Sequence, residues 1–359
     1  MSRKAAMSRR GMLKAAGAGF AVTTLAGCLG NGDADTIRYL SRGGTTQDAE
    51  REIMEQWSEE SGIDVEHQEA ADDTEMMNII DANPGEIDFT NPASWGFAYN
   101  ELEFDGELLA DFDIGEVPAY EDVIQDEWND APMLQGHDKG VFYYISSQGI
   151  GYNTEEADEI TSWHDIKEPQ YEDAVTLFDS GPGRFGNCAA ALGYEPTEAV
   201  QDESLREEVF EEIEAQDENT FTYWSTGDEF MRLLREERAY VASAWGGRIN
   251  VLEDDGHPMH YVIPDEGAVT WSNGWAVCEE SENKDAAYDF INWLYDDEDR
   301  VVELATSFNY PIPIEDPPEE ITQLYDYVDH PDDLAWIDWT IFVPHLDELD
   351  QRLAEIQAG

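Results

Sequence analysis

The fold of this chain is decided by residues 36–68, which read TIRYLSRGGTTQDAEREIMEQWSEESGIDVEHQ. Residues 36–40 predict a strand, and residues 46–60 repeat their apolar side chains at helical spacing. Gly62 ends the predicted helix, and residues 64–68 alternate as a second strand does. A strand, a helix and a strand at this spacing predict a βαβ unit, the building block of a mostly parallel sheet.

The same alternation continues along the rest of the chain. Once a leader is removed, about 330 residues are left, which suggests two lobes rather than one core. The sequence therefore predicts an α/β protein of two lobes. Further strands are predicted at residues 87–90, 174–178, 240–244 and 261–264, further helices at 76–80, 94–102, 284–295 and 346–356, and longer β-rich stretches at 141–152 and 270–278.

The two longer β-rich stretches are the predicted connections between the lobes. The chain is expected to cross from one lobe to the other near residues 145–152 and again near residues 271–276. The first lobe is then expected to hold residues 36–145 and 274–325, and the second lobe residues 146–273 and 326–359.

The first 28 residues predict export from the cytosol. Ser8-Arg9-Arg10-Gly11-Met12-Leu13-Lys14 places adjacent arginines before the short apolar run 15–27, as in a twin-arginine signal. That run is too short for a membrane-spanning helix, which needs about 20 apolar residues. Leu25-Ala26-Gly27-Cys28 resembles the lipobox of exported lipoproteins, whose cysteine becomes acylated. We therefore expect a lipid anchor on Cys28, a polar linker over residues 29–35, and a position at the outer face of the cytoplasmic membrane.

The net charge of −63, from 82 Asp and Glu against 19 Lys and Arg, is the second unusual property of the sequence. Disorder is one interpretation of such a balance, yet 41% of the residues are hydrophobic, which is enough for a large core. Carboxylates dispersed over an ordinary core resemble the proteins of extreme halophiles, where molar salt screens the self-repulsion. The acidity is therefore no argument for a cationic ligand, but it does exclude nucleic acid, which needs a basic surface.

Cysteine and histidine offer little for a cofactor or an active site. With Cys28 acylated, Cys188 and Cys278 remain and are expected to be unpaired, buried thiols. His257 and His260 are expected to be turn residues rather than ligands. No metal and no cofactor is predicted, and no Gly-x-Ser-x-Gly, His-Glu-x-x-His or Walker-type motif indicates an enzyme.

Several short motifs follow one another in a recognisable order. They are QWSEESGIDV (56–65), GIGYN (149–153), SWHDI (162–166), ALGY (191–194), AYDFINWL (287–294) and YPIP (310–313). Their order resembles that of the solute-binding proteins of ABC importers, specifically the spermidine/putrescine-binding family. The resemblance runs from about residue 37 to the end, and it implies the two-lobed type II fold of periplasmic binding proteins, with two crossover strands between the lobes.

The resemblance also implies a pocket. In this family an aromatic box sandwiches the methylenes of the ligand, and carboxylates bind its amine ends. Trp95, Asp179, Trp245 and Trp271 match pocket positions of the family, and Asn273 stands where the family has an aspartate. Core packing is the alternative role of the tryptophans, and helix capping is the alternative for Asp179.

Three arginines indicate a different ligand. Arg42, Arg184 and Arg248 each follow a predicted strand in a loop that contains glycine, which is the ligand side of an open α/β sheet. In a chain with so few cations they suggest a carboxylate or phosphate ligand held by guanidinium groups. Pairing with the abundant surface acids is the alternative.

The sequence thus predicts a monomeric binding lipoprotein that captures a small solute between two lobes and passes it to an ABC permease with its ATPase. A polyamine is the first expected ligand, and an anion held by the three arginines is the second. An exported enzyme and a purely structural surface protein are the rival classes.

Overall fold

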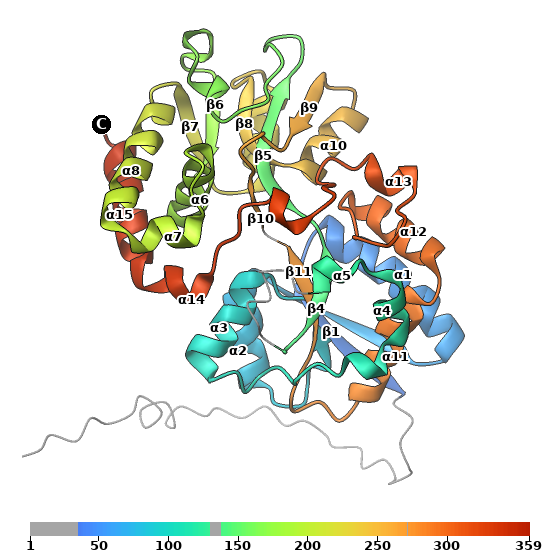
Figure 1. Cartoon of the computed structure of the whole chain (residues 1–359). Coiled ribbons are helices and arrows are strands. Elements are labelled where there is room, and N and C mark those ends of the chain that lie inside the picture. The colour runs from blue at the N-terminus through green and yellow to red at the C-terminus, as the bar shows by residue number, and fades with distance from the viewer. Residues whose placement is uncertain (1–34, 130–137, 271) are drawn as a thin grey trace, which may run out of the picture. The chain divides into compact units, whose positions relative to one another are not determined.

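The structure is a computed structural model that describes residues 35–129, 138–270 and 272–359. Within these ranges the chain forms two β-sheets, each with its own helices (Figure 1). The predicted export signal, Cys28 and the ligand candidate Trp271 lie outside the described residues.

The first sheet has five strands in the order β2-β1-β3-β11-β4. β1 is parallel to β2 and to β3, as the predicted βαβ unit requires. β11 is antiparallel to β3 and β4, so the sheet is mixed rather than mostly parallel, because β11 arrives directly from the other sheet. The strands are β1 (Thr36–Arg42), β2 (Asp64–Ala70), β3 (Phe89–Thr90), β4 (Val141–Tyr144) and β11 (Asn273–Val277).

The helix of the βαβ unit, α1 (Thr45–Ser61), follows its sequence pattern. Ile53, Met54 and Trp57 recur at helical spacing and are all buried. Gly62 ends the helix in a left-handed conformation with φ 78°, and its N–H donates to a carbonyl of the last turn. The apolar stripe holds α1 against the first sheet.

The second sheet has the order β10-β5-β8-β6-β7, and β9 also pairs with β5. β6 is parallel to β7 and β8, whereas β5 is antiparallel to β8 and β9. The sequence analysis missed β7, although its aromatic and β-branched run TFTYW is typical of a strand. The strands are β5 (Ser147–Asn153), β6 (Val175–Phe178), β7 (Thr220–Trp224), β8 (Val241–Trp245), β9 (Met259–Val262) and β10 (Val269–Thr270).

The chain passes between the two sheets where the sequence predicts crossings. Only Ile145 and Ser146 separate β4 from β5, and residues 271–272 separate β10 from β11. A third pass follows the first-sheet helices, and it reaches the second sheet where Ala335 forms a parallel bridge with Val269 of β10. We propose that one lobe holds residues 36–145 and 274–325, and that the other holds residues 146–273 and 326–359. The assignment of the strands to two separate sheets supports this division.

The helices fall into two groups. Those around the first sheet are α1, α2 (Asp73–Ala82), α3 (Ser94–Phe104), α4 (Pro118–Val123), α5 (Asp126–Asn129), α11 (Lys284–Tyr295), α12 (Glu298–Phe308) and α13 (Glu319–Thr322). Those around the second are α6 (Gly181–Ala191), α7 (Pro196–Gln201), α8 (Glu203–Asp217), α9 (Gly227–Arg235), α10 (Gly246–Asp254), α14 (Trp339–Phe342) and α15 (Leu346–Gln357).

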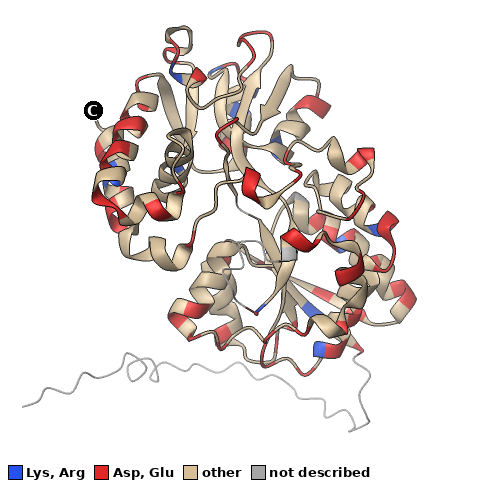
Figure 2. Ribbon diagram, in the orientation of Figure 1, with Lys and Arg blue, Asp and Glu red and all other residues tan. Residues whose placement is uncertain are grey.

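Acidic and apolar residues are separated in space. Figure 2 shows Asp and Glu on the helices and loops of both groups, with few Lys and Arg between them. The interior is aromatic, and Trp57, Trp163, Trp224 and Trp275 are fully buried. The strongly acidic chain therefore retains an ordinary core, as its hydrophobic content predicts.

The two described cysteines are free and buried, as predicted. Burial raises the pKa of Cys188 to about 11, so this thiol stays protonated and unreactive at neutral pH.

Candidate functional site

A cavity of about 540 Å³ lies between the two sheets and collects several of the predicted site residues. β1, β3, β6 and β8 all end beside it, which is where open α/β sheets bind their ligands. Its lining is Arg42, Gly43, Thr46, Glu50, Asp72, Asn91, Tyr144, Ser146, Phe178, Ser225, Trp245, Gly247, Arg248, Val251, Asn273, Ser307, Phe308, Asn309 and Tyr310.

Arg42, Trp245, Arg248 and Asn273 are the predicted residues that the structure brings together here. They come from both sheets, because Arg42 and Asn273 belong to β1 and β11, whereas Trp245 ends β8 and Arg248 lies in the first turn of α10. A solute in the cavity thus contacts both halves of the fold.

Trp95 and Asp179 do not line this cavity. The ring of Trp95 packs edge-on against Trp339 at 5.3 Å between centroids, and its indole N–H donates to Thr74 Oγ1 at 3.1 Å. Asp179 is exposed and accepts a hydrogen bond from Gln357 Nε2 at 2.8 Å. Packing, the alternative role of a tryptophan, describes the position of Trp95 better than ligand stacking.

Arg184 does not line the cavity either. The sequence analysis placed it in a loop, but Gly181–Arg184 form the first turn of α6, which Ser180 caps by accepting from the N–H of Gly183 at 3.2 Å. A serine before a proline-containing first turn is an N-terminal signal that the loop interpretation overlooked. The side chain is 1% exposed and donates through Nη2 to Gln216 Oε1.

Aromatic side chains wall the cavity from both sides. Tyr144 lies 5.2 Å from Phe308 and 5.4 Å from Tyr310, between ring centroids, on one side. Phe178 lies 5.8 Å from Trp245, again between centroids, on the other. Such faces pack against methylene groups and attract ammonium groups.

Glu50 is a site residue that the sequence analysis missed. It belongs to α1 and is fully buried, and its carboxyl group accepts from the Tyr39 hydroxyl and from Asn91 Nδ2, both at 2.7 Å. Burial raises the pKa of Glu50 to about 8. The sequence contains a signal for this role. Glu50 stands three and four residues before Ile53 and Met54, so it lies on the apolar face of the helix, where a charged side chain is unusual and indicates a specific function.

An amide pair joins the strand ends beside Glu50. Asn273 donates through Nδ2 to the backbone carbonyl of Asn91, and its Oδ1 accepts from the Tyr144 hydroxyl at 2.9 Å. The Oδ1 of Asn91 is buried and has no hydrogen-bond partner among the described residues. A buried acceptor without a partner therefore lies beside the buried carboxyl group of Glu50, on a residue that lines the cavity.

The two arginines of the cavity differ in their partners. Arg42 Nη2 donates to Asp73 Oδ2 at 2.7 Å. Arg42 thus pairs with a nearby acid, which is the alternative role given in the sequence analysis. In the described part of the chain, the side chain of Arg248, in the first turn of α10, forms no ion pair and no hydrogen bond with another residue.

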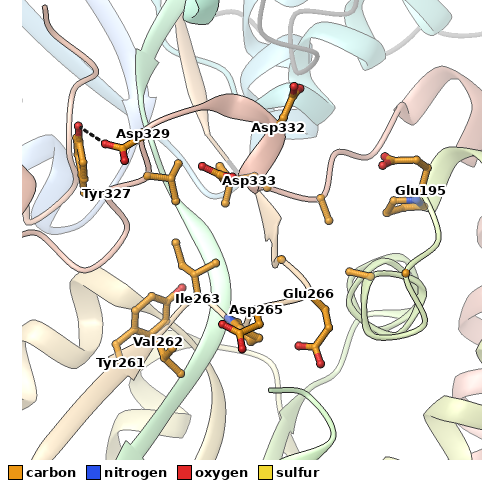
Figure 3. A pocket seen from close by; sticks show the side chains of 18 of the residues that line it. Glu195, Tyr261, Val262, Ile263, Asp265, Glu266, Tyr327, Asp329, Asp332 and Asp333 are labelled. Carbon is orange, nitrogen blue, oxygen red and sulfur yellow. Dashed lines mark hydrogen bonds between the residues drawn. The ribbon is translucent and has the colours of Figure 1, made fainter. Parts of the chain in front are cut away.

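A second cavity of about 690 Å³ shares none of these residues (Figure 3). Carboxylates dominate it, from Asp265 and Glu266 after β9 and from Asp329, Asp332 and Asp333 on the third pass. The surface of the protein is acidic throughout, so the carboxylates of this cavity do not mark it as a site. None of the predicted site residues lines it. In the described ranges no group of three His, Cys, Asp or Glu is placed to hold a metal ion.

Comparison with known proteins agrees with this arrangement. The family model of bacterial extracellular solute-binding proteins matches residues 52–324. The spermidine/putrescine-binding periplasmic protein of Salmonella typhimurium is 25% identical over 264 residues, which cover 73% of each chain. Spermidine/putrescine-binding periplasmic protein 1 of Haemophilus influenzae is 23% identical over 189 residues, which cover 52% of this chain and 51% of that protein.

Solved structures share the fold. The substrate-binding protein of a spermidine/putrescine ABC transporter from Streptococcus pneumoniae superimposes with a TM-score of 0.78 at 20% identity, covering 90% of this chain and all of that one. The resemblance to the spermidine/putrescine-binding family is thus confirmed, and these relatives are solute-binding parts of transporters rather than enzymes. The chain belongs to the family of bacterial extracellular solute-binding proteins.

Proposed function

We propose that this protein is the solute-binding subunit of an ABC importer, that it captures a small amine-bearing solute in the 540 Å³ cavity, and that it delivers this solute to a membrane permease. The observation that carries the proposal is Glu50, a fully buried carboxyl group in the wall of an aromatic cavity. A desolvated carboxylate is costly unless a cation joins it, so an ammonium group is the partner that it favours.

The aromatic walls support the same solute class. Trp245 and Tyr144 stand on the two sides of the cavity and offer π-faces to alkyl ammonium groups, each worth about 1 kcal/mol or more when desolvated. Polyamines, the solutes in the names of the relatives, are the first candidates. The family aspartate is Asn273 here, which leaves Glu50 as the buried acid of the cavity.

An anionic solute is the second candidate, and Arg248 is the observation that favours it. This guanidinium lines the cavity without an ion pair within the described ranges. Arg184, the third arginine of the original prediction, lies elsewhere and is left out of this candidate.

We further propose that the protein is exported through its twin arginines, that acylated Cys28 anchors it at the outer face of the membrane, and that its acidic surface suits molar salt. The periplasmic location named for the relatives supports export. None of the helices in the described residues is both long and apolar enough to span a membrane. Anchoring near the permease raises the effective concentration of the loaded cavity there.

The test is thermal unfolding in molar KCl with putrescine, spermidine, succinate and phosphate, each in excess. A bound solute raises the melting temperature by mass action, by about 2.7 kcal/mol of stability at a hundredfold excess over Kd. We expect amines to raise it, and Glu50→Gln to abolish that rise. Glu55→Gln, an exposed change on the same helix, is the matched control and should keep it.

If only succinate or phosphate raises the melting temperature, the solute is the anion of the second candidate and not an amine. No rise with any solute would contradict the importer role itself. For the anchor, Cys28→Ser should move the protein from the membrane fraction of its cells to the medium, and retention at the membrane would contradict acylation at Cys28.

A further inference from the structure

Asp326 is a fully buried carboxyl group on the third pass of the chain, and the proposed function does not use it. Its Oδ1 accepts from the N–H of Ser147 at 2.9 Å, from the Ser147 hydroxyl, and from the Tyr261 hydroxyl at 3.2 Å. These donors belong to β5 and β9, so one oxygen fastens the third pass to the second sheet. The other oxygen, Oδ2, makes none of these contacts.

Oδ2 of Asp326 lies at the N-terminus of α10. A Cβ on Gly246, the first residue of α10, would overlap this oxygen, so the carboxyl group can lie this close only because the residue is a glycine. Oδ2 is buried and has no hydrogen-bond partner within the described ranges. Trp245, the residue before the helix, provides no side-chain cap. The first N–H groups of a helix need an acceptor, and a carboxylate beside them is stabilising, so an uncapped helix end and a free acceptor meet here.

The first turn of α10 is also part of the cavity wall. Gly247 and Arg248 line the cavity, and so does Trp245, which directly precedes the helix. Tyr310 lines it from the first-sheet side, and a Cβ on Gly247 would lie 2.7 Å from Cζ of that ring. A small shift of this turn therefore changes both the shape of the cavity and the place of its guanidinium group.

We propose that Asp326 is a positioning residue of the solute site, which holds the first turn of α10 in place through Oδ2 while Oδ1 keeps the third pass on β5 and β9. Asp326 does not line the cavity, so it acts on a solute through Gly247 and Arg248 and not by contact. The inference rests on the proposed function, because it concerns the same cavity. It requires the ionised form, since donors occupy Oδ1 and the proton of the neutral acid would lie on Oδ2, facing the N–H groups of α10.

The charge of Asp326 changes near neutral pH. Burial raises the pKa of Asp326 to about 7, against the lowering effect of the donors on β5, β9 and α10. Tyr261, Tyr310 and the adjacent Tyr325 are the titratable groups around it, and burial raises the pKa of each, so they stay protonated. Arg248, whose charge acts on Tyr310 as that of Asp326 does, supplies a fixed positive charge. The hold on α10 should therefore weaken as the pH falls through about 7.

Asp326→Asn tests the inference with little change of shape. Its Oδ1 can still accept from Ser147 and Tyr261, but an NH2 group replaces Oδ2 and faces the donors of α10. Calorimetric titration in molar KCl with putrescine, and with succinate for the second candidate solute, measures the affinities. At about pH 8 we expect the variant to bind at least about fivefold more weakly, and at about pH 6 the two proteins should agree within about twofold.

Ser147→Ala is the matched control, because it removes one hydrogen bond to Oδ1 and leaves Oδ2 at α10. We expect it to keep the affinity within about twofold at both pH values. Burial raises the pKa of Glu50 to about 8, and its titration affects all three proteins alike. Equal weakening in Asp326→Asn and Ser147→Ala, or a difference between Asp326→Asn and the original protein that is the same at both pH values, would overturn the positioning role.

Amide hydrogen exchange without solute separates this inference from the proposed function. At about pH 8 the N–H groups of residues 246–248 should exchange at least about fivefold faster in Asp326→Asn, while those of α11 should keep their rates. Unchanged exchange at residues 246–248 would contradict the inference whatever the solutes do. Faster exchange there, with neither solute bound by the original protein, would support the hold on α10 and contradict the proposed function instead.

Discussion

The side-chain amide of Asn273 joins two strand ends, because its Oδ1 accepts from the Tyr144 hydroxyl at 2.9 Å while its Nδ2 donates to the carbonyl of Asn91. Tyr144 ends β4, and Asn91 directly follows β3, so the amide fastens the rim of the cavity across β11. This role needs one hydrogen-bond donor and one acceptor. An asparagine side chain has both, whereas an ionised aspartate has acceptors but no donor.

Asn273→Asp should therefore lower the stability of the protein, although it restores the residue of the related family. The carboxylate would face the carbonyl oxygen of Asn91, at a cost of about 1–3 kcal/mol. Thermal unfolding at neutral pH measures the loss, and below about pH 4 the protonated aspartic acid can donate again, so the loss should shrink. Asn78→Asp adds the same charge at an exposed position of α2 and serves as control. Equal losses in the two variants would contradict the bridging role.

Glu50→Gln should change how stability depends on pH. The folded-state pKa of Glu50 is about 8, against 4.5 for a free side chain, so between these values the folded chain keeps a proton that the unfolded chain has released. The stability that Glu50 contributes is complete below about pH 4.5 and is lost as the pH rises through 8.

The Gln variant has no such proton, so its free energy of unfolding should fall less between about pH 5 and 8 than that of the original protein. Asp326, whose pKa burial raises to about 7, contributes a slope of the same sign to both proteins. Chemical unfolding at several pH values gives the two curves. Parallel curves would contradict the burial of an ionisable group at Glu50.

Asp326→Ala should destabilise the third pass of the chain. The Asp326 carboxylate is fully buried and accepts from the N–H of Ser147 at 2.9 Å and from the Tyr261 hydroxyl at 3.2 Å. Removing it leaves the N–H of Ser147 buried without an acceptor, whereas the Tyr261 hydroxyl can still donate to the carbonyl of Ser147 at 3.1 Å, so we expect a loss of about 1–3 kcal/mol in urea unfolding. Asp329→Ala, an exposed neighbour on the same pass, should stay within about 0.5 kcal/mol. Similar effects of the two changes would contradict this role.

Gly247→Ala should weaken solute binding more than it weakens the fold. A Cβ at this position would lie 2.7 Å from Cζ of Tyr310, so the ring has to move within the cavity that both residues line. We expect the affinity for the cognate solute to fall at least about tenfold. Calorimetric titration measures this, with circular dichroism as the check on folding. Unchanged affinity would place the solute away from Tyr310.

Arg184→Met should leave solute affinity within about twofold, because Arg184 lies buried in α6 rather than in the cavity wall. Arg248→Met is the matched comparison, and it should reduce the affinity for any solute with a carboxylate. Both follow from the same titrations. Loss of binding in Arg184→Met would return this residue to the site that its sequence position first suggested.

Local patterns in the sequence predicted part of the fold, but not β7 or the helices α8, α9, α10 and α12. The predicted helix over residues 284–295 is α11 (Lys284–Tyr295), and the predicted crossings coincide with the passages from β4 to β5 and from β10 to β11. What it could not give was the direction of β11, because an antiparallel entry depends on where the chain comes from and not on the strand's own residues.

The site was harder to predict for a similar reason. Arg42 and Arg248 share the same sequence context, glycines beside the end of a predicted strand, and a loop was predicted for both. The structure instead places Arg42 at the end of β1 and Arg248 in the first turn of α10. Only the fold shows that Arg42 pairs with Asp73, whereas Arg248 forms no ion pair within the described ranges. Glu50 was missed because family matching looks for known positions, whereas a charge on the apolar face of a helix is a signal of a different kind.

The three passes between the sheets have a mechanical consequence. Two bodies connected by one strand can swivel freely, but three adjacent connections, of which Asp326 fastens one to the start of β5, leave bending about a common axis as the softest motion. Opening of this protein should then be described by a single angle. A solute in the cavity, whose lining comes from both bodies, would set that angle.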